Sequence, residues 1–339
     1  MNSPDMSVPV AKAETGWHPD VSIIIVSWNC REMLAGCLRE VFASRLDVPF
    51  EVIVVDNASV DGTSEIIPRL FPQVRLLENT DNLGFAKANN QAFGLAQGRF
   101  LMLLNPDAFP SSPETFGRML DFLRGHPEIA GAGCTLVHPN GSHQVGDAGF
   151  KPTLGNVLAY ALGLSRMFPG RVGLFLGKVP QKTFWIDVDW ICGAFFIVRR
   201  SIVDKVGGLD ERYFLYGEDI EWGCRIRRSG YRLAYVVQET VIHIQGGTHG
   251  NGGAPERIST RWLDSLGFLF AEQNNGRHWF WFKAAMALGF VWRAAVYRVI
   301  SVVFRRADTR RKSAAMSVYA KHIWALQRHA GSETTGCRT

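Results

Sequence analysis

The residues of this chain that could do chemistry are acidic and amide side chains that follow apolar runs. They are Asp56, Asn105, Asp107, Glu218 and Asp219. In an open α/β sheet, ligands collect outside the carboxyl ends of the strands. A carboxylate there can hold a divalent cation, and that cation can hold a diphosphate.

Asp56 directly follows the apolar run 51–55. A carboxylate at this position can accept a hydrogen bond from the imide N–H of uracil or thymine. The residues after it, Asn57, Ser59 and Asp61, are also typical of a turn that caps the next helix. Capping explains the cluster but does not require an aspartate at the strand end, so both interpretations stay open.

Asn105 and Asp107 flank Pro106 at the end of the run 100–104. The proline fixes the local backbone and keeps the residue before it extended, so both side chains could point toward one ligand. The alternative is an Asx-turn that simply ends a strand.

Glu218 and Asp219 precede a helix that carries Trp222 and Ile226 on another face. Acidic residues in a first helical turn complement the helix dipole, which accounts for Glu218 without any function. Asp219 could instead be a general base that takes the proton from an attacking hydroxyl. His243, after Thr240-Val-Ile, suits a cation site as a neutral imidazole and favours Mn²⁺ over Ca²⁺, although one histidine is more often structural.

These side chains need a sheet to position them. Apolar runs predict strands at 21–26, 51–55, 74–77 and 100–104, and amphipathic segments predict helices at 31–43, 64–70 and 87–96. The alternation favours an α/β fold with a doubly wound, mostly parallel sheet flanked by helices. Beyond Pro110 the pattern is less regular: 138–184 and 246–253 read as loops, 190–199 and 231–237 as strands, and 219–228 as a helix.

Composition and missing motifs exclude several classes. The chain has 339 residues, and none of its six cysteines forms a CxxC pair, so neither a zinc site nor a redox dithiol is expected. The start of the chain does not resemble a secretory signal, which favours a cytoplasmic setting. GxGxxG after a strand, GxxxxGK[ST], HExxH and GxSxG are all missing, so nicotinamide, P-loop and hydrolase-triad chemistry lack support.

The tail is basic and apolar. From Arg277 onward the chain has 12 Lys/Arg and 2 Asp/Glu, although its net charge is only +6. On a helix over 279–306, a cationic side (Lys283, Arg293, Arg298 and Arg305) lies opposite an apolar side (Trp281, Leu288, Trp292, Val299 and Val303). This pattern favours a helix lying on an anionic membrane surface. The sequence shows no recognisable nucleic-acid-binding motif. The uncharged run 284–292 is too short to span a bilayer. The alternative is a helix packed on the catalytic body or on a homodimer partner.

Eight short motifs together resemble the inverting family 2 glycosyltransferases of GT-A fold, and among them the bacterial rhamnosyltransferase-like branch. They are Val26-Ser-Trp-Asn29, Val54-Val-Asp-Asn-Ala-Ser59, Asp61-Gly-Thr63, Asn82-Leu-Gly-Phe85, Asn105-Pro-Asp107, Cys192-Gly-Ala194, Gly208-Leu-Asp-Glu211 and Tyr216-Gly-Glu-Asp219. The resemblance covers about residues 20–250.

The resemblance implies a role for each matching residue. It implies that the nucleotide sugar is bound by Ser27, Asn29, Asp56, Asn57, Asn82, Gly84, Lys87, Asn105 and Asp107. It implies an acceptor site at Trp190, Cys192, Gly193, Ala194 and Glu218, with Asp219 as the catalytic base beside Glu218. It implies that Mn²⁺ or Mg²⁺ is held by Asp107, His243 and Asn105. Asn105 departs from the family's DxD pattern, and an amide there coordinates without adding charge.

The implied organisation is an arm at 1–20, a nucleotide-sugar-binding half at 21–110, an acceptor-binding and catalytic half at 111–276 and the basic helical tail at 277–339. The implied function is transfer of a sugar, rhamnose from dTDP-rhamnose in this branch, to a cell-surface or lipid-linked glycan at the inner face of the cell membrane. The alternative is a catalytically weak nucleotide-sugar-binding module or a membrane scaffold.

Overall fold

A computed structural model of the chain describes residues 18–170, 172–180, 182–244, 259–274, 276–304 and 307–327. Most of the predicted arm at 1–20 and the predicted loop at 246–253 lie outside the described residues.

The first half alternates strands and helices as predicted. Its elements are β1 (Val21–Ser27), α1 (Arg31–Ala43), β2 (Phe50–Asp56), α2 (Thr63–Leu70), β3 (Arg75–Glu78), α3 (Phe85–Leu95) and β4 (Phe100–Leu104). The strands β1, β2 and β4 are rich in Val, Ile and Leu because helices cover both of their faces. Val21 lies beside Phe50 on one side and Phe100 on the other, in parallel register.

The second half is more regular than the sequence indicates. It contains β5 (Ala108–Pro110), α4 (Thr115–Gly125), β6 (Ile129–Val137), β7 (Ala148–Gly149), α5 (Leu154–Ala161), the 3₁₀ turn η1 (Leu164–Arg166), β8 (Trp185–Val188), β9 (Trp190–Ile191), β10 (Phe195–Arg199), α6 (Arg200–Val206), α7 (Glu218–Arg228) and β11 (Arg232–His243). The strand predicted at 190–199 is broken by a turn at 192–194, and β11 runs six residues past its predicted end. Because of these two differences, the turn at 192–194 and His243, the last residue of β11, lie at the end of the sheet.

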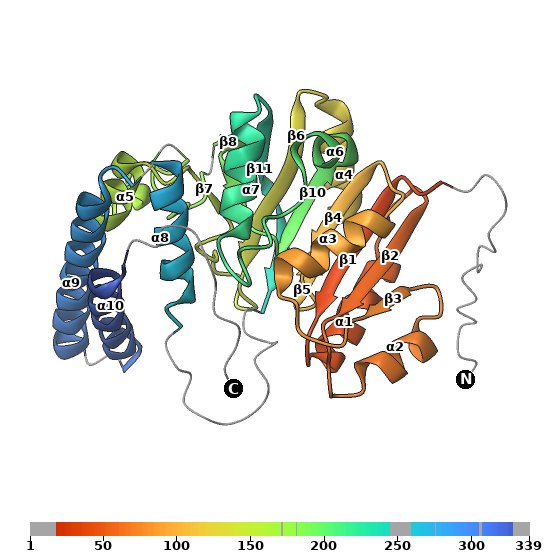
Figure 1. Cartoon of the computed structure of the whole chain (residues 1–339), viewed down its shortest axis with the longest axis horizontal. Helices are drawn as coiled ribbons and strands as arrows, with labels where there is room; N and C mark the ends of the chain where they lie inside the picture. The colour runs from red at the N-terminus through yellow and green to blue at the C-terminus, as the bar shows by residue number, and fades with distance from the viewer. Residues whose placement is uncertain are drawn as a thin grey trace.

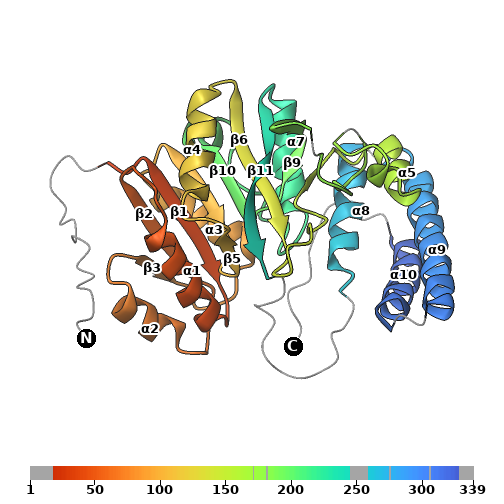
Figure 2. The same cartoon turned by 180° about the vertical axis from the view of Figure 1, so that it is seen from behind.

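One large sheet joins the two halves in the order β3-β2-β1-β4-β10-β6-β11-β5, with β8 also paired to β11. Six of its nine strands run in one direction, while β5, β8 and β10 run in the other. Helices α1 and α4 cover one face, and α3, α6 and α7 cover the other (Figures 1 and 2). The predicted mostly parallel α/β fold is thus confirmed.

Three further helices form a layer at the end of the molecule away from β1–β3 (Figure 1). They are α8 (Arg261–Gln273), α9 (Trp279–Val303) and α10 (Ala307–Ala325). Their core is apolar: Leu263, Leu266 and Phe270 of α8 pack with Phe282 and Phe290 of α9. The tail therefore forms a helical layer that also includes α8, which the sequence placed in the catalytic half.

The side chains of α9 divide differently from the predicted two-sided pattern. All five residues of the predicted apolar side are exposed. Two residues of the predicted cationic side instead pack inward: Lys283 donates to Leu326 O (2.8 Å), and Arg293 lies 4.2 Å over the ring of Tyr160 in α5. Arg298 is exposed, and Arg305 lies outside the described residues. By length and composition the whole helix α9 is apolar enough to cross a membrane, although its uncharged run at 284–292 is short.

Candidate active site

Asp56 lies at the end of β2, and only 3% of it is exposed. Burial raises the pKa of its carboxyl group, while hydrogen bonds from Ser59 oppose this shift. Asp61 contacts the first residues of two helices, because its Oδ1 accepts from Thr63 Oγ1 (2.6 Å) in α2 and its Oδ2 accepts from Arg31 N (2.8 Å) in α1. The turn is therefore explained without Asp56, whose position fits a ligand contact.

Asn57 is tied into the protein on every side. Its Nδ2 donates to Asn82 Oδ1 (3.0 Å) and Gly84 O (3.1 Å). Its Oδ1 accepts from Asn79 Nδ2 (3.0 Å) and Leu83 N (3.2 Å). Asn57 and Asn82 therefore hold the start of α3 against β2, and their contact with the nucleotide sugar stays a prediction.

The loop after β1 is fixed in a similar way. Ser27 is fully buried, with its Oγ 3.2 Å from Cys30 Sγ, so its side chain contacts the loop from inside the protein. Asn29 has a φ of 50°; its backbone N–H donates to Ser59 Oγ and its Oδ1 accepts from Val60 N, both at 2.8 Å. Lys87, in the first turn of α3, is exposed. Among the residues predicted to bind the nucleotide sugar, Lys87 therefore has a charged side chain that a ligand can reach from solvent.

Asp107 and His243 lie together, because β5 and β11 pair in antiparallel register with His243 beside Ala108. The distance from Asp107 Oδ1 to His243 Nε2 is 3.2 Å, and both side chains are buried. Asn105 Nδ2 lies 3.3 Å from the same Nε2. The three residues predicted to hold a metal are thus brought together.

Gln144 contacts the other nitrogen of His243. Its Oε1 lies 2.9 Å from Nδ1 and can only accept, so this contact favours the tautomer with the proton on Nδ1 and a lone pair on Nε2. That lone pair faces Asp107 Oδ1, which has no hydrogen-bond partner among the described residues. Two acceptors that face each other in a buried place fit a bound cation. The described residues hold no group of three or more His, Cys, Asp or Glu side chains, so an amide and ligand oxygens would complete the shell.

Sequence reasoning missed Gln144 and the residues that hold its loop. Asp147 is buried, and its Oδ2 accepts from Tyr235 Oη (2.5 Å) and contacts His143 Nε2 (3.0 Å). These bonds attach residues 143–147 to β11 beside His243. The only sequence signal was the cluster of His, Gln and Asp inside a segment without periodicity.

Glu218 and Asp219 begin α7 after the left-handed residues Tyr216 (φ 70°) and Gly217 (φ 93°). Burial raises the pKa of Asp219 to about 6, and hydrogen bonds from Ile220 and Gly193 oppose this shift. Burial and the neighbouring Asp219 raise the pKa of Glu218 further, and Glu218 Oε2 is buried without a partner in the described part of the chain. The pKa of Glu218 is thus raised more than that of Asp219, so Asp219 is the carboxyl group of this pair whose charged form is better stabilised.

The turn at 192–194 joins this pair to the cation site. The Cys192 thiol and the Gly193 backbone hydrogen-bond to the Asp219 carboxylate. On the other side, Ala194 O accepts from Asn105 N (3.0 Å). Trp190 differs from its predicted acceptor role: it is 2% exposed and its Nε1 donates to Leu174 O (3.1 Å), so it is a core residue behind the turn.

Tyr216 lies in the turn just before the carboxyl pair, and 39% of its surface is exposed. Burial raises the pKa of its hydroxyl, as do the charges of Glu218 and Asp107, while Arg261 of α8 lowers it. Tyr216 is therefore within electrostatic reach of both the cation site and the carboxyl pair. Arg261 is a second residue that sequence reasoning missed, because its proximity to Tyr216 depends on how α8 packs.

Comparison with known proteins shows the family of this chain. The model of the family described as Glycosyl transferase family 2 matches residues 22–207. The chain belongs to this family. It is a glycosyltransferase of the rhamnosyltransferase-like kind, since curated rhamnosyltransferases are among its relatives.

Two relatives and two solved structures illustrate the likeness. The N-acetylglucosaminyl-diphospho-decaprenol L-rhamnosyltransferase of Mycobacterium tuberculosis is 27% identical over 262 residues, which cover 70% of this chain and 78% of that protein. The rhamnosyltransferase WbbL of Escherichia coli is 25% identical over 66% of this chain and 83% of its own length.

The solved structures support the GT-A fold alone. A Pyrobaculum calidifontis mannosyltransferase, solved with GDP-Man and Mn²⁺, aligns with a TM-score of 0.56 at 18% identity, over 93% of this chain and 89% of that one. GalNAc-T7, solved with UDP, GalNAc and Mn²⁺, aligns with a TM-score of 0.55 at 15% identity, over 80% of this chain and 52% of that one.

Proposed function

We propose that this glycosyltransferase transfers rhamnose from dTDP-rhamnose to a lipid-linked glycan acceptor, with inversion at the anomeric carbon. The observation that carries the proposal is the turn at 192–194, which contacts Asn105 of the cation site through Ala194 and the Asp219 carboxylate through Cys192 and Gly193. A cation site and a base on opposite sides of one turn suit a reaction in which a diphosphate leaves as a hydroxyl attacks.

Asp107, His243 and Asn105 would hold the cation. Asp107 supplies the charge, His243 supplies the Nε2 lone pair, and Asn105 supplies its amide oxygen when the amide is turned over. A divalent cation at this place would stabilise the negative charge of the departing diphosphate. The Mn²⁺ complexes of the two structural neighbours support a cation of this type.

Asp219 acts as the general base. Its carboxylate is ionised at neutral pH, and its pKa near 6 allows it to take a proton as the acceptor oxygen attacks. Burial and the neighbouring Asp219 raise the pKa of Glu218 well above its usual range, so the environments of the two carboxyl groups favour different roles. A single displacement needs no covalent enzyme intermediate, and inversion follows.

Donor and acceptor are inferred from the relatives. The mycobacterial protein is named for rhamnosyl transfer to a diphospho-decaprenol-linked sugar, and WbbL is named a rhamnosyltransferase. Asp56 would accept the imide N–H of the thymine ring, a pyrimidine contact that uracil would also satisfy. An acceptor of this kind would be met at the cytoplasmic face of the cell membrane.

A thermal-shift panel of nucleotide sugars, each with and without Mn²⁺ or Mg²⁺, tests the proposal because a ligand that binds only the folded state raises the melting temperature. We expect the largest stabilisation from dTDP-rhamnose with a cation. An equal response to all donors, or none to the cation, would contradict it. Donor binding without turnover on lipid-linked acceptors would support the alternative of a nucleotide-sugar-binding module.

A further inference from the structure

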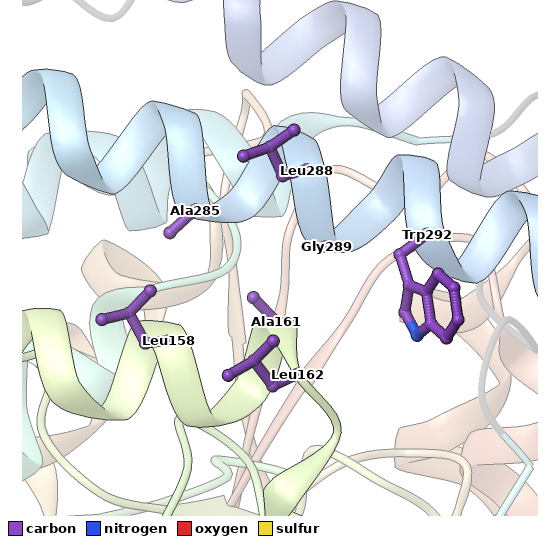
Figure 3. A pocket seen from close by; sticks show the side chains of 7 residues that line it. All are labelled: Leu158, Ala161, Leu162, Ala285, Leu288, Gly289 and Trp292. Carbon is purple, nitrogen blue, oxygen red and sulfur yellow. The ribbon is translucent and has the colours of Figure 1, made fainter.

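An uncovered apolar groove runs between α5 and α9, far along the chain from the catalytic residues. Figure 3 shows its lining from both helices: Leu158, Ala161, Leu162, Ala285, Leu288, Gly289 and Trp292. Its volume is about 250 Å³. Every one of these side chains is apolar, so the groove offers nothing to a sugar or a phosphate but fits a hydrocarbon chain.

The groove is a built feature, with small residues on its floor and large ones on its walls. A Cβ at Gly289 would lie 2.6 Å from Ala161 Cβ, so the two helices touch there. Leu162, Leu288 and Trp292 stand at the walls and are 65%, 69% and 63% exposed. Beside the groove, Arg293 stacks on Tyr160 and donates to its carbonyl oxygen, which holds α9 against α5.

The surface around the groove is apolar and cationic together. Exposed aliphatic and aromatic side chains extend it along α9 and past the end of α5: Met167, Phe168, Phe280, Trp281, Val299, Val302, Val303 and Phe304. Exposed cations lie before α9, within it and on the neighbouring helix α10, namely Arg277, Arg298, Arg310 and Arg311. The sequence of α9 contains no aspartate or glutamate. Aromatic anchors beside cations are typical of surfaces that lie on anionic lipid.

We propose that the α5–α9 face docks on an anionic membrane and that its groove takes a lipid hydrocarbon chain. The proposal deepens the proposed function, on which it rests for its purpose: a lipid-linked acceptor would be met at this surface. Helix α8 connects the two places, since Arg261 lies near Tyr216 and the next residue, Trp262, packs 6.1 Å from Phe290 of α9.

A second copy of the chain fits this face less well than lipid does. A twofold contact places the same patch on both partners. It would therefore bring the cations of one copy near those of the other, with no acidic residue of α9 to balance them. An anionic membrane surface complements the same charges.

Vesicle co-sedimentation of the full-length chain tests the docking. We expect binding to vesicles of phosphatidylglycerol and phosphatidylcholine in equal parts, and weaker binding to phosphatidylcholine alone. The double variant Leu288→Glu, Trp292→Glu should lose about tenfold or more of this affinity, since it places two negative charges on the α9 side of the groove. Leu70→Glu, at an exposed helical leucine in α2, is the matched control and should bind as the unaltered chain does.

Fluorescence separates the groove from the surface around it. Lipids brominated in the acyl chain should quench Trp292, seen as the difference between the unaltered chain and Trp292→Phe. Full vesicle binding by the double variant would overturn the docking. Unchanged Trp292 emission on brominated vesicles would overturn the groove as the chain site. A lipid-free dimer that the double variant splits, without vesicle binding, would assign the face to a second copy. None of these measurements uses the donor, so failure of the proposed reaction would leave them intact.

Discussion

Glu218 and Asp219 are neighbours in the sequence but differ in what they can do. Both are acidic residues in the first turn of one helix, and burial raises the pKa of each. Only Asp219 receives hydrogen bonds from Gly193 and Ile220, which favour its charged form. The neighbouring turn at 192–194 therefore distinguishes the base from the acid beside it.

Asp219→Asn should lower turnover by about 10²–10⁴-fold, because the amide cannot accept the acceptor's proton. Donor affinity, measured by the thermal shift with dTDP-rhamnose, should stay within about twofold, since the cation site does not include Asp219. Equal losses of turnover and donor affinity would contradict the role of base.

The pH dependence of kcat/KM should show an acidic limb near the pKa of Asp219, about 6. Below that pH the carboxylate binds a proton and cannot act as a base, so the rate should fall about tenfold per pH unit. Glu218→Gln replaces the neighbouring acid with an amide and should leave the limb in place. A limb that moves with this variant would show that Glu218 carries the titration.

Gln144→Leu removes the acceptor that favours the proton on His243 Nδ1. We expect the Mn²⁺ concentration needed for half-maximal activity to rise about 10–100-fold, as is typical when the partner of a ligating histidine is lost. Gln144→Glu keeps an accepting oxygen and should retain most of the affinity. An unchanged metal requirement in Gln144→Leu would remove Gln144 from the site.

At the scale of elements, the start of α3 fits closely against the loop before α7. Gly84 has a φ of 83°, and a Cβ there would lie 2.5 Å from the carbonyl oxygen of Phe214. Phe85 N donates to that same oxygen (2.9 Å). The loop before α3 and the loop that carries Tyr216 therefore contact each other at the Phe214 carbonyl oxygen.

Gly84→Ala should lower the free energy of unfolding by about 1–3 kcal/mol, because both the left-handed backbone and the close approach resist a side chain. It should also weaken donor binding, since the loops must separate. Gly94→Ala, in the same helix with open space around it, should instead stabilise the protein by about 0.5–1 kcal/mol. Urea unfolding of the two variants checks both signs, and similar effects at the two positions would refute this explanation.

The elements that could be predicted from the sequence are those whose residue types are determined by burial. Strands β1, β2 and β4 were found because their β-branched and leucine residues contact helices on both faces. Strand β6 was missed because it is rich in Gly and Ala; a Cβ at Gly131 would lie 2.6 Å from the Phe196 ring, and one at Gly133 would lie 2.3 Å from Ile191. Large neighbours on β9 and β10 thus determine the composition of this strand.

The same limit applies to the candidate site. Asp56, Asp107 and Asp219 could be proposed because each follows an apolar run or opens a helix. Gln144 and Arg261 could not, because their importance depends on contacts across about 100 residues or on helix packing. Trp190 was assigned to the acceptor site together with Cys192. Its burial, which the sequence does not reveal, shows that it is a core residue.

At the scale of the whole molecule, the helical layer is part of the fold. Phe282, Met286 and Phe290 of α9 are buried against apolar residues of α8 and α10. An anchor that only touched the membrane would not bury these side chains in the protein.

Deletion of the chain from Trp279 onward should therefore give insoluble protein or a lower melting temperature, because Leu263, Leu266 and Phe270 of α8 would be exposed. Expression, solubility and thermal melting measure this result. The variant Leu288→Glu, which alters only the outer face, should melt as the unaltered chain does. A soluble and active truncated enzyme would show that the layer is dispensable for folding.

The pairing of β5 with β11 also sets when the enzyme can become active during synthesis. Asn105 and His243 are 138 residues apart, and the strand that carries His243 is the last one of the described sheet to be made. Contacts of such separation form late, because a long loop must close before they contribute. A nascent chain can thus complete β1–β4 well before it acquires His243, so the residues proposed to hold the cation come together only after β11 has been made.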